Sequence, residues 1–281
     1  FNYCINIFSN RKDTLSTSIH SGRTDSRWTR TVGSVFSTYN FRYTFDNTQK
    51  VSEMLRNGAT QILDTMRHHV STFHADEMFF QYQGKLFEFS TIGNEPVQIV
   101  PMELDGYPFH FIVMDIRDTY KYELRFLDTR YDQKQLEIFV NIYNAILSSM
   151  LNTEKVSELR RCVPLEYIPN ECIADISMLK GHQNDFSASI SVLDDDGHKQ
   201  PYGAWGNLYA NGEPVDGVTA RIMSDNTLDF LENSGRCVMS EGLTKRRFFD
   251  LNKLEETLMD HEDISDAYAY MSYESRSITL C

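Results

Sequence analysis

Three histidines that lie close together are the first residues of this chain that could do chemistry. His68, His69 and His74 fall within one short segment, and neighbouring imidazoles can bind a metal ion or transfer protons. His69 or His74 could then act as the base of a self-sufficient acyltransferase that uses CoA thioesters. The same histidines follow an amphipathic segment, and basic side chains at a helix C-terminus are stabilised by the helix dipole. We therefore favour a structural interpretation of the cluster.

No familiar catalytic motif accompanies the histidines. The sequence contains no G-x-S-x-G, H-E-x-x-H or G-x-x-x-x-G-K-[ST] pattern, so a nucleophile elbow, a zinc-protease helix and a phosphate-binding loop are not expected. The cysteines are odd in number and lack C-x-x-C spacing, which argues against a zinc site and a disulfide framework. They are Cys4, Cys162, Cys172, Cys237 and Cys281. We expect no bound metal and a cytoplasmic location.

Composition and charge suggest two globular units. The 281 residues are 41% hydrophobic and 24% charged, which is ordinary for one or two soluble domains. No apolar run is long enough to span a membrane, and the N-terminal residues lack the basic region and long apolar region of a signal peptide. The first residue, Phe1, is not a Met. We therefore expect no membrane partner, and a chain that begins inside a longer one. Up to Pro164 there are 18 basic and 19 acidic residues, and beyond it 9 and 21. This asymmetry indicates a boundary near residue 165, and it makes the acidic second unit a poor partner for nucleic acid. An acidic surface that only aids solubility would explain the asymmetry too.

Strands and helices alternate in the first unit. Residues 107–116 and 120–126 are rich in β-formers and are separated by a short polar turn, so they predict an antiparallel hairpin. An apolar stripe from Leu136 to Leu151 then predicts a helix capped by Asp132. Further strands are expected at 5–8, 14–20 and 78–83, and a helix at 46–70 capped by Asp46 or Thr48. Gly58 inside that helix costs about 1 kcal/mol relative to Ala, which suggests close packing against a neighbour.

The order of these segments resembles the C-terminal end of condensation domains of nonribosomal peptide synthetases. The family pattern [IV]-G-x-F-V-N-T-x-x-x-R is matched at Val32, Gly33, Thr38 and Arg42, with Ser37 in place of the Asn. Tyr107-Pro-Phe-His-Phe, the hairpin, the helix and Val156-Ser-Glu-Leu159 then follow in the family order. The resemblance covers residues 1 to about 160.

That resemblance implies the C-terminal lobe of the two-lobed CoA-dependent acyltransferase fold, an α+β lobe with a mixed sheet and flanking helices at residues 1–163. The catalytic H-H-x-x-x-D-G motif of the family belongs to the other lobe, and Phe73 replaces its Asp after His68 and His69. We therefore expect no catalytic residue and no tightly bound cofactor here. The expected partners are a carrier protein with its phosphopantetheine arm and other synthetase domains. Candidates to line the substrate tunnel are Gly33, Ser37, Thr38, Tyr39 and Arg42.

The remainder resembles the tail of an adenylation domain, a small β-rich α+β unit at 187–281 after a linker at 164–186. The family patterns V-x-V-L-D, G-E-L-Y, T-G-D-L-x-R and D-G-x-L-E-F-L-G-R have counterparts, in order, at 191–194, 206–209, 216–221 and 225–236. The residues that remain from the nucleotide-binding motifs are Gly217, Val218, Arg221, Gly235 and Arg236.

The departures from the adenylation pattern decide its expected activity. The Asp that holds the ATP ribose in the family falls on Val218, which cannot accept a hydrogen bond through its side chain. The long nucleotide-binding core has no counterpart between residues 160 and 187. We therefore expect no ATP activation, and turn geometry explains Gly235 and Arg236 better than chemistry. Two functions stay open: a fragment of an amide-forming condensation enzyme, and a non-catalytic docking or scaffold module of a synthetase.

Overall fold

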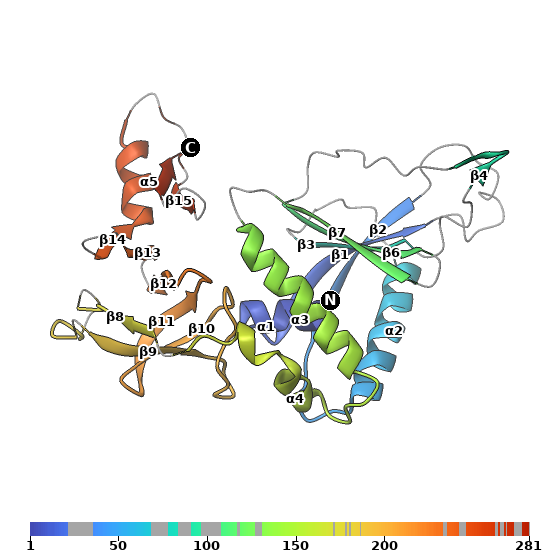
Figure 1. Cartoon of the computed structure of the whole chain (residues 1–281), viewed down its shortest axis with the longest axis horizontal. Coiled ribbons are helices and arrows are strands. Elements are labelled where there is room, and N and C mark those ends of the chain that lie inside the picture. Colours follow the sequence, from blue (N-terminus) through green and yellow to red (C-terminus); the bar gives the residue numbers. More distant parts are fainter. Residues whose placement is uncertain are drawn as a thin grey trace.

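The chain forms an α+β structure, as the sequence predicts, and the described residues hold two large sheets and two small two-stranded ones. The computed structural model describes residues 1–21, 36–68, 78–83, 91–96, 108–116, 119–126, 131–170, 172–177, 179, 181–185, 187–232, 235–241, 246–261, 264, 267, 269–272 and 277–280. The first unit holds a five-stranded sheet with helices, and the second unit holds a seven-stranded sheet followed by a helix (Figure 1). Among the described residues, no helix is both long and apolar enough to cross a membrane.

The sheet of the first unit is mixed. Its strand order is β2-β1-β3-β6-β7; β1, β3 and β6 run parallel, while β2 and β7 are antiparallel edge strands. The elements are α1 (Asn2–Ser9), β1 (Asp13–Ser21), β2 (Phe36–Thr44), α2 (Val51–Arg67), β3 (Met78–Tyr82), β4 (Thr91–Ile92), β5 (Glu95–Pro96), β6 (Phe109–Ile116), β7 (Thr119–Phe126), α3 (Gln133–Ser149) and α4 (Val156–Leu159). The predicted hairpin is confirmed, with Phe111 opposite Leu124.

Helix α3 closes one face of this sheet. Its apolar stripe packs Phe139, Ile142, Tyr143 and Ile146 against Phe111 and its neighbours in the first core. The Asp132 carboxylate accepts a hydrogen bond from the Gln135 backbone N–H at 3.2 Å, which confirms the predicted cap. In Figure 1 α3 runs across the sheet, and α2 packs on β2.

Two predictions for the first unit are wrong. Residues 5–8 belong to helix α1 and not to a strand, because Tyr3, Cys4 and Ile7 recur at helical spacing and are buried in the core. Helix α2 begins at Val51 with Lys50 as its N-cap. Asp46 instead closes a turn by accepting hydrogen bonds from Thr48, so neither of these residues caps the helix.

The second unit is an antiparallel meander, in the order β14-β13-β12-β11-β10-β9-β8. Its elements are β8 (Cys172–Ala174), β9 (Ala188–Leu193), β10 (Gly206–Ala210), β11 (Glu213–Ile222), β12 (Leu228–Glu232), β13 (Gly235–Glu241), β14 (Arg246–Asp250), α5 (Leu251–Met259), β15 (Ala269–Ser272) and β16 (Ser277–Leu280). Alternate residues of β9 face the second core, where Ala188, Ile190 and Val192 are buried.

The segment assigned to a linker, 164–186, carries part of the second core. Strand β8 pairs with β9, with Cys172 opposite Ile190. Ile176 and Leu179 are also buried there. The second unit therefore starts before residue 187, because these side chains need the seven-stranded sheet to exclude water from them. Tyr202 packs against both cores and joins them.

Candidate functional site

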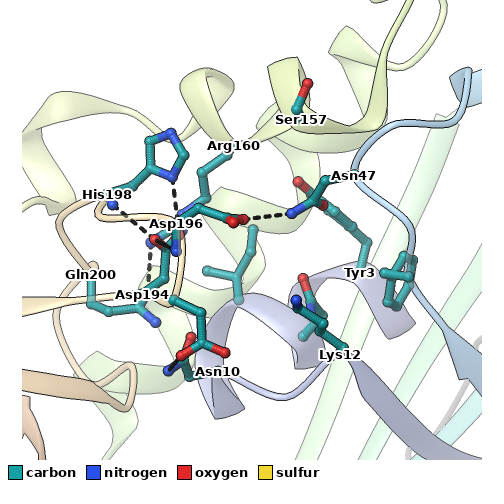
Figure 2. A pocket seen from close by; sticks show the side chains of 14 residues that line it. Tyr3, Asn10, Lys12, Asn47, Ser157, Arg160, Asp194, Asp196, His198 and Gln200 are labelled. Atoms are coloured by element: carbon teal, nitrogen blue, oxygen red, sulfur yellow. Dashed lines mark hydrogen bonds and ion pairs between the residues drawn. The ribbon is translucent and has the colours of Figure 1, made fainter.

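A small polar cavity lies where the two units meet. Its volume is about 50 Å³, enough for one or two water molecules. Residues of α1 and of the segment around α4 form one wall, and the turn at 194–198 of the second unit forms the other (Figure 2). Figure 2 shows the Arg160 and His198 side chains gathered around Asp194, while the Asp196 carboxylate points across the boundary to Asn47. We call the contact between the two units the seam.

Arg160 is the central residue of the seam. Its Nε donates to the Asp194 carboxylate at 3.2 Å, and its Nη2 donates to the Lys199 carbonyl at 3.0 Å and to the Gln200 side chain. The Arg160 and Asp194 side chains are only 8% and 14% exposed. Burial lowers the pKa of the Arg160 guanidinium, and Asp194 opposes that shift. A guanidinium remains charged in proteins, so this is a buried ion pair between the units.

The Asp194 carboxylate also organises its own turn. Its Oδ1 accepts hydrogen bonds from the backbone N–H groups of Asp196 and His198, and His198 Nδ1 lies 3.2 Å from its Oδ2. Asn10 donates to Asp195 and Asn47 donates to Asp196, so the turn is held from the first unit as well (Figure 2). The carboxylates are occupied by these donors, which suits a lock between units better than a reaction centre. No three His, Cys, Asp or Glu side chains among the described residues are placed to hold a metal ion.

The seam continues along the loop at 199–205. Gln135 at the start of α3 donates from Nε2 to the Gly203 carbonyl at 3.0 Å. The backbone N–H groups of Trp205 and Tyr202 donate to the Phe8 and Tyr167 carbonyls. Gly203 has a φ of +78°, and a Cβ there would lie 2.6 Å from Gln135 Cγ. The chain therefore needs glycine here, both for the left-handed backbone and for the close approach.

A second, larger cavity lies between α2 and the sheet of the first unit. Its volume is about 490 Å³, and it is open on one side. Apolar and aromatic side chains of α1, α2, β1, β2 and β3 line it, among them Phe41, Tyr43, Met54, Ile62 and Phe80. We call it the α2 groove. Leu55 on the groove wall and Leu63 farther along α2 are 49% and 54% exposed, so the apolar face of α2 is only partly covered by the described residues.

Gly58 lies in the wall of this groove. A Cβ at Gly58 would lie 3.8 Å from the Tyr43 ring, which is ordinary van der Waals contact. Gly58 therefore packs beside β2 at an ordinary distance, and the contact does not require a glycine.

Polar groups gather at one end of the α2 groove. His20 lies near the carboxyl end of β1, and Tyr82 ends the neighbouring parallel strand β3. Burial lowers the pKa of His20, so its imidazole is neutral near pH 7. Its ring lies 5.3 Å from that of Tyr39, and Tyr82 donates to Asp115 at 3.4 Å.

The chain shows a partial structural likeness to known proteins. No protein-family model and no curated protein matches the sequence. Among solved structures, the crystal structure of a holo four-domain nonribosomal peptide synthetase bound to AMP and glycine is similar, with a TM-score of 0.48 and 12% sequence identity. The match covers 62% of this chain and 16% of that synthetase. At these values the likeness is one of chain path in part of a peptide synthetase.

The predicted tunnel residues do not line the α2 groove. Gly33 lies outside the described residues, and the other four are on edge strand β2. Strand alternation places Ser37 and Tyr39 on the same face as Phe41 and Tyr43, which line the groove. Thr38 and Arg42 face the other side, where the exposed Arg42 guanidinium pairs with Asp13. The tunnel role of these residues stays a prediction.

The residues left from the adenylation pattern take structural places. Val218 is 5% exposed and packs in the second core. Arg221 pairs with Asp229 on the adjacent strand at 2.7 Å, and its guanidinium lies 4.8 Å from the Trp205 ring centre. Gly217 has a φ of +73°, and Gly235 and Arg236 begin β13. Of Gly235 and Arg236 the structure describes the backbone alone.

The sequence singled out the histidine cluster but did not single out the residues of the seam. His68 is the C-cap of α2, and its Nδ1–H donates to the Asp64 carbonyl at 2.9 Å, in line with a structural role. His69 and His74 lie outside the described residues. Sequence reasoning missed Arg160, Gln135 and Gln200. Their partners lie 34 to 68 residues away, so no local spacing could have marked them.

Proposed function

We propose that this chain is part of a nonribosomal peptide synthetase, in which residues 1–163 form the C-terminal lobe of a condensation domain. The residues beyond form an adenylation-like remnant without nucleotide chemistry. The observation that carries this proposal is the ordered set of condensation-type segments folded around one mixed sheet, β2-β1-β3-β6-β7. The lobe supplies a wall for carrier-bound aminoacyl or acyl thioesters, while proton transfer belongs to the H-H-x-x-x-D-G lobe. The cytoplasmic location is part of the same proposal.

The second candidate is a non-catalytic docking module of a synthetase, and the seam favours it. A buried ion pair and several backbone hydrogen bonds hold the remnant against the lobe, although Val218 is sealed in the second core. A remnant without chemistry that is held this firmly serves as a rigid docking surface. The two candidates share the carrier-protein partner and differ in whether amide formation uses this lobe.

The first experiment mixes the chain with a carrier protein bearing its phosphopantetheine arm. Calorimetry should detect binding of the loaded carrier protein and no tight binding of ATP. Aminoacyl and peptidyl carrier proteins mixed with the chain should give no peptide product. Turnover by this chain alone would overturn the incomplete-site proposal, and tight ATP binding would overturn the remnant proposal.

A second experiment separates the two candidates. Reading the transcript upstream of the codon for Phe1 should reveal an H-H-x-x-x-D-G motif if the lobe belongs to a working condensation domain. A start codon directly before it would favour the docking module.

A further inference from the structure

The α2 groove has the properties of a small-molecule site. Pockets of about 300 to 1,000 Å³ with apolar and aromatic walls and a few polar groups are typical of ligand sites, and this one measures about 490 Å³. It runs beside α2 from Met54 to Ile62, a distance of about 12 Å at 1.5 Å per residue. The cavity is therefore elongated along the helix.

The two ends of the groove differ in chemistry. At the end near Met54, Tyr43 donates its hydroxyl to the Met54 carbonyl at 3.1 Å and Tyr3 donates its hydroxyl to the Val156 carbonyl at 3.2 Å. Both hydroxyls are therefore hydrogen-bonded within the fold, and the two tyrosines present their rings to the cavity. At the other end lie the Ser18 hydroxyl, the His20 imidazole and the Tyr82 hydroxyl. Asn2 also lines the groove, but its amide is already bonded to Thr14 and Ser16. The second end therefore offers a ligand more hydrogen-bonding groups than the first.

The charge of the lining side chains and the volume of the groove restrict the kind of ligand that could bind there. None of the described side chains that line the groove is a Lys, Arg, Asp or Glu, so a charged ligand would lose its hydration without gaining a counter-ion. The volume of about 490 Å³ suits a small molecule.

We propose that the α2 groove binds an uncharged small molecule with an elongated apolar body and one hydrogen-bonding end, as in a medium-chain alcohol. The apolar body lies along α2 over Tyr43 and Phe41, and the polar end meets Ser18, His20 and Tyr82. The proposal is argued from the lining of the groove alone, so it does not rest on the proposed function.

Displacement of a fluorescent probe tests the proposal. N-phenyl-1-naphthylamine is neutral and brightens in apolar sites, so it should bind the full chain, and decan-1-ol should displace it near neutral pH. Decanoate and decylammonium should displace it about tenfold more weakly, because the groove offers no counter-charge. Equal displacement by the ions would overturn the claim that the ligand is uncharged.

Two filling variants locate the site. Gly58→Leu and Ala59→Leu place side chains in the groove and should reduce probe binding at least tenfold. Asn57→Leu adds the same side chain on the exposed side of α2 and should leave binding unchanged. Thermal unfolding identifies any variant that fails to fold. Probe binding to either folded filling variant at the wild-type level would show that the probe sits elsewhere and would overturn the proposal.

A third variant examines the polar end. Tyr82→Phe removes one hydroxyl and should weaken decan-1-ol about fivefold, the value of one hydrogen bond, while leaving the apolar probe unaffected. Unchanged decan-1-ol affinity would remove Tyr82 from the site.

Sedimentation measures the oligomeric state of the chain at the assay concentration, and we expect a monomer. If the chain were a dimer that binds the probe only after dissociation, a second copy of the chain would occupy the groove. That result would overturn the proposal. Failure of the carrier-protein experiment would leave these results untouched.

Discussion

The seam and the α2 groove both border α1, and Tyr3 and Phe45 line both, yet they are closed in different ways. At the seam a buried guanidinium, a carboxylate and backbone groups meet with defined partners around a cavity of about 50 Å³. At the groove apolar side chains face a cavity ten times larger. The first arrangement holds two parts of one chain together. The second leaves apolar area exposed to water, at a cost of about 25 cal/mol per Å², which an occupant would recover.

The largest effect is expected where the seam loses its charge. Arg160→Met leaves Asp194 buried without its ion-pair partner and should lower the free energy of unfolding by about 3 to 5 kcal/mol. Arg161→Met changes the adjacent exposed arginine in the same way and should shift it by less than about 0.5 kcal/mol. Urea unfolding of both variants measures the difference. Equal effects would mean that the seam contributes nothing beyond an ordinary surface contact.

Acid should weaken the first unit before it affects the seam. Burial, with Arg125 adding to it and Glu123 opposing it, lowers the pKa of His110 from 6.5 to about 4. Between these values the unfolded chain binds a proton that the folded chain does not, so stability falls as the pH drops through this window. The loss is about 3 kcal/mol at most.

Urea unfolding at a series of pH values measures this loss, and His110→Leu should remove it. His110 lies on β6 of the first unit, packed against Phe79. If the pH dependence survived in His110→Leu but vanished in Arg160→Met, the acid-sensitive group would belong to the seam instead.

Alanine substitutions at two glycines with similar positive φ angles should separate the stability cost of a steric clash from the cost of the backbone conformation. Gly203→Ala should cost about 2 kcal/mol, since the new Cβ meets Gln135 and the φ of +78° is unfavourable for alanine. Gly212 has a φ of +87° with nothing within 4 Å of its would-be Cβ, so Gly212→Ala should cost about 1 kcal/mol. The difference in urea midpoint is the contribution of seam packing. Identical losses would show that Gln135 moves aside freely.

The sequence was sufficient where the physics is local. The β6–β7 hairpin, helix α3 and its Asp132 cap follow from alternation, periodicity and a side chain three residues from its partner. The same reasoning failed for residues 5–8, since four apolar positions fit a strand and a helix equally well. It placed the start of α2 too early, because Asp46 bonds Thr48 in a turn and the helix begins after Lys50, which forms a bridge with Lys155.

The candidate sites were harder to foresee. Asp194 stood inside a recognised adenylation-like segment, but its partner Arg160 belongs to the first unit and no pattern joins them. The groove depends on how far α2 stands from β2, a tertiary distance that helix periodicity does not contain. Apolar positions on α2 predicted a buried face, and the structure leaves the Leu55 and Leu63 side chains of that face about half exposed.

The smallest expected effect has the opposite sign and belongs to the groove. Gly58→Ala should stabilise the chain by about 1 kcal/mol, because alanine favours a helix interior and its Cβ would fit 3.8 Å from the Tyr43 ring without a clash. Thermal and urea unfolding measure the gain, with Gly203→Ala as the seam counterpart that loses stability. A loss for Gly58→Ala would show that α2 closes on β2 in solution, and the groove would then be too narrow for the ligand proposed above.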